Sequence, residues 1–183
     1  MASYVILWIL AAVLVVAVIG LYRQLGLLHL RMGNTGALDV EGQGPPLGQK
    51  VSQMELTDLA GEVHEVGVGQ EALLVILSVG CSACERLLPS LQVYGQDHRT
   101  IVVTGGVPEA ANDLSSRLGK VPVVWNRRVI DDFAVTLPPF AIRVDSKGLV
   151  VGRGIVNNLG QLEELERESL VRSSMVTAMD EYP

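Results

Sequence analysis

The chain has 183 residues, a formal net charge of −6 and an apolar content of 49%. This length is enough for one domain of ordinary size with an appendage. Residues 1–49 are neutral overall, so residues 50–183 carry the whole negative charge. An acidic domain without a basic cluster argues against nucleic acid as a partner, and two cysteines are too few for a disulfide framework.

The first 22 residues are the most apolar stretch of the chain. Val5–Leu21 carries no charge and would form a helix of about 26 Å, close to the thickness of a bilayer core. Tyr4, Trp8 and Tyr22 stand towards its ends, where interfacial aromatic residues are common. A signal peptide would need a basic segment before the apolar run and a small-residue cleavage site after it. The sequence lacks both, so it predicts a transmembrane anchor over residues 1–22.

Residues 23–49 are predicted to form a juxtamembrane helix and a linker. Apolar residues recur at helical spacing between Arg23 and Met32. The run Gly42-Gln-Gly-Pro-Pro-Leu-Gly48 is rich in helix breakers and leads into the globular part. Because Arg23 and Arg31 follow the anchor, the positive-inside rule alone would leave the globular part in the cytoplasm.

Residues 50–172 are predicted to form an α/β domain. Strands are expected at Ser52–Leu56, Glu62–Val66, Leu73–Val79, Thr100–Thr104, Val121–Trp125, Ala141–Val144 and Leu149–Val151, and helices at Ser82–Tyr94, Pro108–Leu118 and Leu159–Leu170. The turn Asp145-Ser-Lys-Gly148 joins the last two strands as a hairpin, which predicts a mixed sheet flanked by helices. Pro89 should kink the first helix, and residues 173–183 are expected to be a flexible tail.

The candidate catalytic residues are Cys81 and Cys84, at the junction between a buried strand and a helix. This placement of a Cys-x-x-Cys is typical of a thioredoxin-like redox site. Backbone N–H groups and the helix dipole favour a thiolate at Cys81, which is therefore the expected attacking group. Cys84 lies one turn further into the helix and is the expected resolving group. The reversible disulfide Cys81–Cys84 would be the redox centre, with no separate cofactor.

Metal binding and scaffolding remain as alternatives for the cysteine pair. No other cysteine or histidine lies at ligand spacing nearby, so the sequence predicts no zinc site. Copper(I) needs only two soft ligands, which keeps a copper chaperone open. A non-catalytic assembly factor, acting through the segment before the domain, is a third hypothesis. His64 and His98 are expected to be ordinary exposed histidines, and Glu85 to complement the helix dipole.

The residues around the cysteines resemble the thioredoxin-like superfamily, which includes the TlpA-like proteins. Pro89, five residues after Cys84, matches the helix-kink proline of that superfamily, and Pro139 matches its cis-proline. The resemblance implies a cis bond between Pro138 and Pro139 in the substrate-binding region. It also implies that the backbone carbonyl of Pro138 lies beside Cys81.

A more specific resemblance is to one family, the methylamine utilization protein MauD. It is carried by the anchor, the cysteine motif and the segments Arg23-Gln-Leu-Gly-Leu-Leu-His-Leu-Arg31, Gly36-Ala-Leu38, Gly44-Pro-Pro-Leu-Gly48 and Gly154-Ile-Val-Asn-Asn158. The resemblance implies a membrane-anchored thiol-disulfide oxidoreductase, acting as a disulfide oxidase or isomerase. Its implied client is the cysteine-rich light subunit of methylamine dehydrogenase, with an unidentified redox partner. Because disulfides form outside the cytoplasm, the domain is expected to face the periplasm despite the two arginines.

Two positions depart from the thioredoxin pattern. Gly80 stands where thioredoxins commonly have a tryptophan, and Val75 stands where many members carry a buried acid. By this resemblance, the acid that shuttles the proton of the second cysteine in those members is missing here. The absence of the acid at position 75 disfavours action as a reductase more than action as an oxidase or isomerase.

Overall fold

The computed structural model describes residues 6–11, 13–16, 18–19, 37 and 42–180. The chain divides into two units, residues 1–35 and 36–183. In the first unit, the described residues 6–11, 13–16 and 18–19 are helical. Within the part of the chain that the structure describes, no helix combines the length and apolar character needed to cross a bilayer. The anchor predicted over residues 1–22 is described only in part, and the juxtamembrane helix predicted from Arg23 lies outside the described residues.

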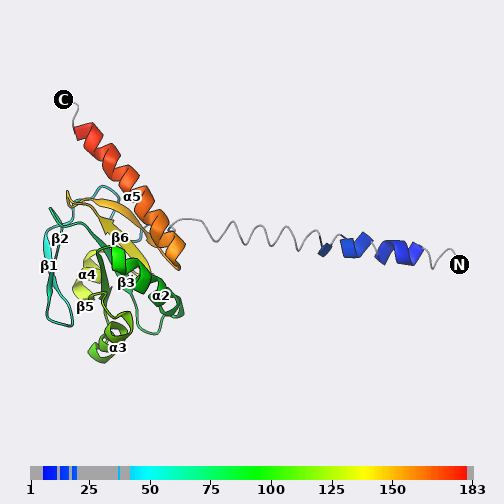
Figure 1. Cartoon of the computed structure of the whole chain (residues 1–183), viewed down its shortest axis with the longest axis horizontal. Coiled ribbons are helices and arrows are strands. Elements are labelled where there is room, and N and C mark those ends of the chain that lie inside the picture. Colours follow the sequence, from blue (N-terminus) through cyan, green and yellow to red (C-terminus); the bar gives the residue numbers. More distant parts are fainter. Residues whose placement is uncertain (1–5, 12, 17, 20–36, 38–41, 181–183) are drawn as a thin grey trace. The chain divides into compact units, whose positions relative to one another are not determined.

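The second unit is built around a five-stranded mixed sheet (Figure 1). Its strands run in the order β5-β4-β3-β6-β7, and their bounds are Ala72–Leu77 (β3), Thr100–Thr104 (β4), Val123–Trp125 (β5), Phe140–Val144 (β6) and Val150–Ile155 (β7). The first three strands in this order are parallel, and β6 and β7 join antiparallel. The mixed sheet predicted from the sequence is therefore confirmed.

Strand β3 is central because both of its faces are covered. All six of its residues are buried, which explains why it reads as a continuous apolar run rather than an alternating one. Leu74 and Ile76 belong to one apolar cluster, while Leu73, Val75 and Leu77 belong to the other. Successive side chains point to opposite faces of the sheet, so this single strand joins two cores.

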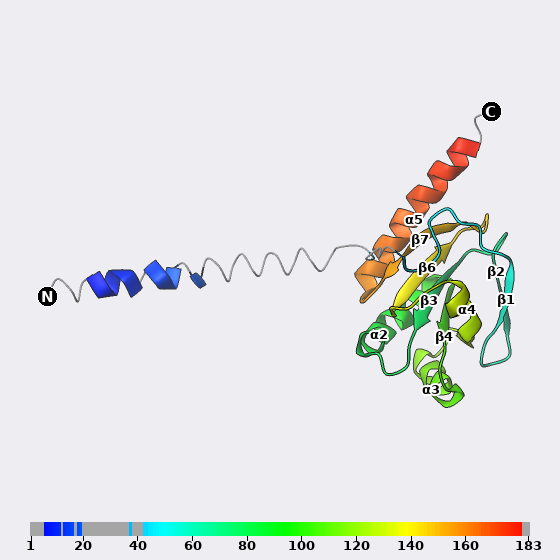
Figure 2. The same ribbon diagram turned by 180° about the vertical axis from the view of Figure 1, so that it is seen from behind.

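Helices cover the two faces unequally, as Figures 1 and 2 show from opposite sides. The helices are α2 (Ser82–Asp97), α3 (Pro108–Leu118), α4 (Arg127–Asp132) and α5 (Leu159–Asp180). Buried residues of α2, α3 and α5 share a cluster with Leu73, Val75 and Leu77. The short helix α4 and the hairpin of β1 (Met54–Thr57) and β2 (Val63–Val66) pack on the other face.

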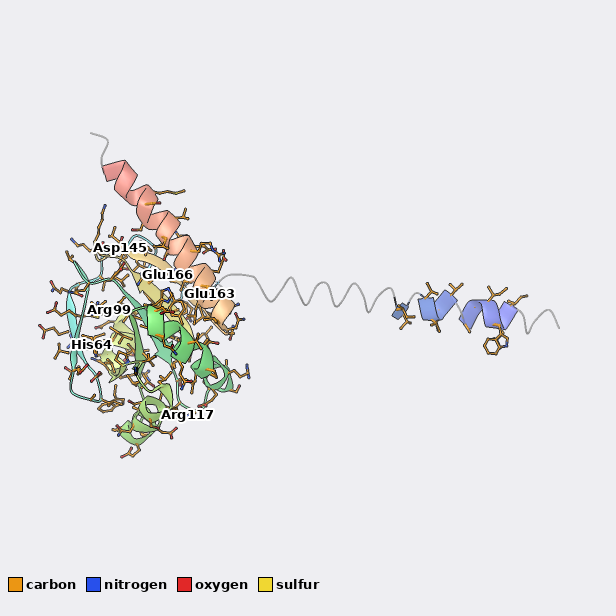
Figure 3. All side chains as sticks on the ribbon, in the orientation of Figure 1. His64, Arg99, Arg117, Asp145, Glu163 and Glu166 are labelled. Carbon is orange, nitrogen blue, oxygen red and sulfur yellow. The ribbon has the colours of Figure 1, made fainter. Side chains whose placement is uncertain are left out.

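A buried polar network holds α2 against α5. Arg143 of β6 is only 7% exposed, and its guanidinium lies 3.0 Å from the carboxylate of Glu166, labelled in Figure 3. The Tyr94 hydroxyl at the end of α2 donates to the same carboxylate at 3.1 Å. These contacts link the helix that carries the cysteines to the last helix and to β6.

Several predicted boundaries need correction. The domain begins before residue 50, because Gln43 and Pro45 are buried and the N–H of Gly48 donates to the carbonyl of Val150 in β7. The last helix does not end at Leu170 but runs to Asp180, through most of the tail predicted to be flexible. One reason is tertiary: the Arg172 guanidinium donates to the carbonyl of Val151.

Helix α4 was not predicted from the sequence. Its six residues, Arg127–Asp132, are too few to show a helical period. The available signal was Asn126, whose side chain caps the helix by accepting from the N–H of Val129 at 3.2 Å.

Candidate redox site

The cysteine motif sits where β3 turns into α2. Gly80 has a φ of +76°, in the left-handed region that favours glycine, which gives a local reason for glycine at the tryptophan position. Cys81 is the N-cap of α2, and its sulfur accepts a hydrogen bond from the N–H of Cys84 at 3.2 Å. Both cysteines are free thiols; Cys81 is partly exposed and Cys84 is buried. The predicted difference in exposure between the two thiols is therefore confirmed.

Burial sets the chemistry of the inner cysteine. Cys84 is 3% exposed and packs among Leu87, Leu88 and Val75 in one apolar cluster. Burial raises the pKa of Cys84 to about 12, and its hydrogen bond with Cys81 adds to the rise. Cys84 is therefore protonated at neutral pH, while Cys81 is the thiol within reach of a substrate.

A proline pair faces the outer cysteine across the site. The thiol of Cys81 lies 3.8 Å from the carbonyl oxygen of Pro138. The peptide bond between Pro138 and Pro139 is cis. The carbonyl of Pro139 accepts from the N–H of Val156 at 3.3 Å. Both geometric expectations that the superfamily resemblance carried are confirmed, and the structure brings the cysteines and the proline pair together.

A second contact lies behind the cysteines, between α2 and α3. Glu85 forms an ion pair with Arg117 (labelled in Figure 3), and this guanidinium also lies 3.6 Å from Asp113. The hydrogen bond from Arg117 lowers the pKa of Glu85. A small cavity of about 50 Å³ is lined by these three residues and Cys84. Glu85 was expected only to complement the helix dipole, and the structure adds an ion pair across helices.

A groove of about 450 Å³ is lined in part by Pro138, and neither cysteine is among its lining residues. It is lined by the ends of β3 and β4, by α4 and by the residues before Pro138. Its lining mixes apolar side chains such as Val79 and Ile130 with the charged pair Arg127 and Asp131, whose atoms lie 3.0 Å apart. The sequence did not predict this groove, because α4 and the proline loop meet only in the folded chain.

Exposed apolar residues surround the same groove. Val79 lines it and is 48% exposed, and Leu137, directly before Pro138, is 51% exposed. Trp125 is also exposed, and its indole N–H donates to the carbonyl of Gly106 in the groove lining at 2.9 Å. An apolar surface next to an accessible thiol is suited to contact with polypeptide.

The two histidines of the folded domain, His64 and His98, have structural partners away from the cysteines. His64, labelled in Figure 3, lies 2.9 Å from the carboxylate of Asp58. The ring of His98 stacks on Tyr94 with centroids 4.0 Å apart. Asp58 and Glu62 lie close enough to His64 to offer three metal ligands, but Asp58 also accepts two backbone N–H bonds in the hairpin turn. Neither histidine pairs with the cysteines, as expected, but both are half-buried rather than exposed.

No family model matches the chain. Curated relatives are nevertheless similar over most of its length. The chain is 28% identical over 172 residues to the methylamine utilization protein MauD of Paracoccus denitrificans, covering 90% of this chain and 86% of the relative. It is 29% identical over 170 residues to MauD of Paracoccus versutus, with the same coverage. MauD of Methylorubrum extorquens is 27% identical over 172 residues, covering 90% of this chain and 83% of the relative.

Solved structures share the architecture. StoA of Bacillus subtilis superposes with a TM-score of 0.54 at 18% identity, over 64% of this chain and 99% of that one. The thioredoxin domain of a thiol-disulfide oxidoreductase from Bacteroides vulgatus superposes with a TM-score of 0.54 at 16% identity, over 67% of this chain and 97% of that one. A thio-disulfide isomerase from Thermus thermophilus superposes with a TM-score of 0.54 at 19% identity, over 68% of this chain and 97% of that one. The chain thus has the thioredoxin-like fold and is similar to MauD over nine-tenths of its length, as the sequence predicted.

Proposed function

We propose that the protein is a thiol-disulfide oxidoreductase that forms or rearranges disulfides in a polypeptide client. The observation that carries this proposal is the position of the Cys81 thiol. It caps α2, it is partly exposed, and it lies 3.8 Å from the carbonyl of Pro138, with Cys84 buried one turn behind it. The similarity to MauD and the thioredoxin-like fold shared with thiol-disulfide oxidoreductases support it.

As an oxidase, the protein would start with the disulfide Cys81–Cys84. A client thiolate attacks the sulfur of Cys81, the Cys81–Cys84 bond breaks, and Cys84 leaves and takes up a proton. A second client thiolate then attacks the client sulfur of this mixed disulfide and displaces Cys81. The client gains a disulfide, and the protein is left with two thiols. A redox partner with an oxidised disulfide or an equivalent two-electron acceptor must restore the bond.

As an isomerase, the protein would start with both thiols reduced. Cys81 attacks a client disulfide and forms the mixed disulfide, releasing one client thiol. Cys84 could resolve this intermediate only after losing its proton, which its pKa of about 12 disfavours at neutral pH. The mixed disulfide then persists long enough for another client thiolate to attack its client sulfur, which forms a new client disulfide and releases Cys81 as a thiolate. The buried Cys84 and the apolar Val75 therefore favour rearrangement over reduction.

The groove beside Pro138 is the proposed client site. The carbonyl of Pro138 can accept a backbone N–H from an extended client segment next to the reacting cysteine. Val79, in the groove lining, and Leu137, directly before Pro138, offer exposed apolar side chains for contact. A cysteine-rich chain that has not finished folding exposes both kinds of group.

The proposals for the client and the location rest on the resemblance to MauD. We propose that the client is a cysteine-rich extracytoplasmic protein, the light subunit of methylamine dehydrogenase. Residues 1–22 would anchor the protein in the cell membrane, with the redox domain facing the periplasm. A C-terminal fusion to a reporter that is active only outside the cytoplasm should be active, and a silent fusion at normal expression would contradict this orientation.

The redox proposal is tested by trapping. The Cys84→Ala variant should accumulate a mixed disulfide between Cys81 and a client peptide that carries a disulfide, detected by non-reducing mass analysis. The Cys81→Ser variant should form none and should lose oxidation and isomerisation activity, while Ser82→Ala, at an exposed neighbour, should keep both. Stoichiometric copper(I) binding that either cysteine substitution abolishes, without redox turnover, would instead support a copper chaperone.

A further inference from the structure

We propose that Gln43 is a positioning residue of the redox site, because it fixes the loop that presents the Pro138 carbonyl to Cys81. The proposal rests on the proposed thiol-disulfide function and deepens it. Gln43 lies in the segment that was expected to be a linker. It is only 7% exposed, and its side chain reaches residues more than ninety positions away.

The side-chain hydrogen bonds of Gln43 go to the two residues before Pro138. Its Oε1 accepts from the backbone N–H of Thr136 at 3.0 Å and from that of Leu137 at 3.2 Å. Its Nε2 donates to the hydroxyl oxygen of Thr136. One buried amide thus holds two consecutive backbone N–H groups and one side-chain hydroxyl.

The backbone around Gln43 is itself held by the domain. The guanidinium of Arg153 in β7 lies 3.1 Å from each of the carbonyl oxygens of Gln43, Gly44 and Pro45 and donates to them. The N–H of Gly44 donates to the carbonyl of Ala134 at 3.4 Å. The backbone of Gln43 is therefore held in place, and this fixes the position from which its side chain binds Thr136 and Leu137.

Glycine at position 44 is what allows this close approach. Gly44 has a φ of +69°, and a Cβ built there would lie 2.5 Å from the ring of Phe140, the first residue of β6. The segment therefore packs directly over the start of the strand that follows the proline pair. Gln43 and Gly44 together contact residues on both sides of Pro138 and Pro139.

This support matters because the site depends on one carbonyl. On the C-terminal side of the proline pair, the carbonyl of Pro139 accepts a hydrogen bond from the N–H of Val156. On its N-terminal side, the backbone N–H groups of Thr136 and Leu137 donate hydrogen bonds to Gln43. The orientation of a client segment on Pro138 depends on this alignment, and misplacement by about 1 Å can cost orders of magnitude in rate. A small reagent that only needs access to sulfur does not depend on it.

The test compares two reactions of Cys81 in the full-length reduced protein. One is formation of a mixed disulfide with a peptide disulfide, and the other is alkylation by iodoacetamide. Gln43→Ala should slow the peptide reaction about tenfold and change alkylation by less than about twofold, because only the peptide needs the Pro138 carbonyl. Gln43→Glu, which keeps the accepting oxygen, should restore most of the peptide rate.

Matched variants exclude a general loss of folding. Gln49→Ala, at an exposed glutamine of the same segment, should leave both rates unchanged. If Gln43→Ala does not fold, Gln43→Asn keeps the amide but shortens the side chain, and it should show the same selective loss. An unchanged peptide rate in Gln43→Ala, or an equal loss in both reactions, would overturn the positioning role. A wild-type protein that is alkylated but never reacts with peptide disulfides would instead overturn the proposed function.

Discussion

The thiol of Cys81 lies 3.8 Å from the carbonyl oxygen of Pro138, although 57 positions separate the two residues in the chain. Cys81 follows the central strand β3 and caps α2, and Pro138 comes just before β6, which pairs antiparallel with β3. Because the end of β3 pairs with the start of β6, the sulfur and the carbonyl lie at the same end of these two strands. The reactive atom and the group that can orient a client are placed by one strand ladder.

The raised pKa of Cys84 predicts a dependence of stability on alkaline pH. The pKa of this thiol rises from 9.0 in the unfolded reference to about 12 in the folded protein. The folded state therefore prefers the protonated thiol, and this stabilisation is fully present below pH 9. It should be lost as the pH rises from about 9 towards 12.

The measurement is the free energy of unfolding of the reduced protein relative to Cys84→Ala. The difference between the two proteins should be constant at neutral pH and should shrink above pH 9, because all other titrating groups are common to both. A difference that stays flat through this range would show that Cys84 does not titrate as its burial requires.

Replacing Val75 by aspartate should change the direction of the chemistry. Val75 is buried in the same cluster as Cys84, so a carboxylate there could take the thiol proton and speed resolution of a mixed disulfide. The buried charge should also destabilise the protein, by about 2–5 kcal/mol. The expected result is faster release of a trapped peptide from Val75→Asp, measured by stopped-flow.

An asparagine at the same position is the control for Val75→Asp. Val75→Asn carries similar polarity and size but cannot accept the proton as a carboxylate does. It should be destabilised without faster release. Equal release rates in the two variants would mean that position 75 does not govern the proton of Cys84.

A charge on the apolar rim of the groove should weaken client binding. Leu137 is 51% exposed beside Pro138, and Leu137→Asp should lower the kcat/KM for a polypeptide client about tenfold, mainly through KM. Val63→Asp is a matched control, since Val63 is 57% exposed on the distant hairpin. Equal effects of the two variants would place client contact elsewhere.

Two glycines test whether the segment before residue 50 belongs to the folded domain. Gly44 and Gly48 both have a positive φ, so alanine is strained at either position. Only at Gly44 does the new Cβ meet another residue, the ring of Phe140. Gly44→Ala should therefore cost about 2–4 kcal/mol in unfolding free energy, and Gly48→Ala about 1 kcal/mol. Equal costs in urea unfolding would show that this segment does not pack as described.

Local signals were sufficient for most elements of the domain. Thr100–Thr104 and Pro108–Leu118 were predicted with the bounds that the structure has. Their apolar runs and their Pro and Gly boundaries depend only on neighbouring residues. Helix α4 and the last turns of α5 could not be predicted in this way. The first is too short to show a period, and contacts such as Arg172 with Val151 support the second.

The candidate site divides along the same line. The Cys-x-x-Cys spacing and its place after an apolar run predicted both cysteines, because the start of a helix after a strand is a local property. The proline pair came from resemblance to known proteins. Gln43 gave no signal at all, since a glutamine among glycines and prolines is typical of a linker.

The amino-acid sequence by itself determined that this protein has a buried strand, two cysteines at the start of the following helix and an α/β order of elements. The tertiary structure decided what surrounds the thiols. It placed the Pro138 carbonyl at Cys81, buried Cys84 against Val75, and brought Gln43 to Thr136 and Leu137. The reason is physical: periodicity and helix capping act within a few residues, whereas pKa shifts and buried hydrogen bonds depend on groups that only folding brings together.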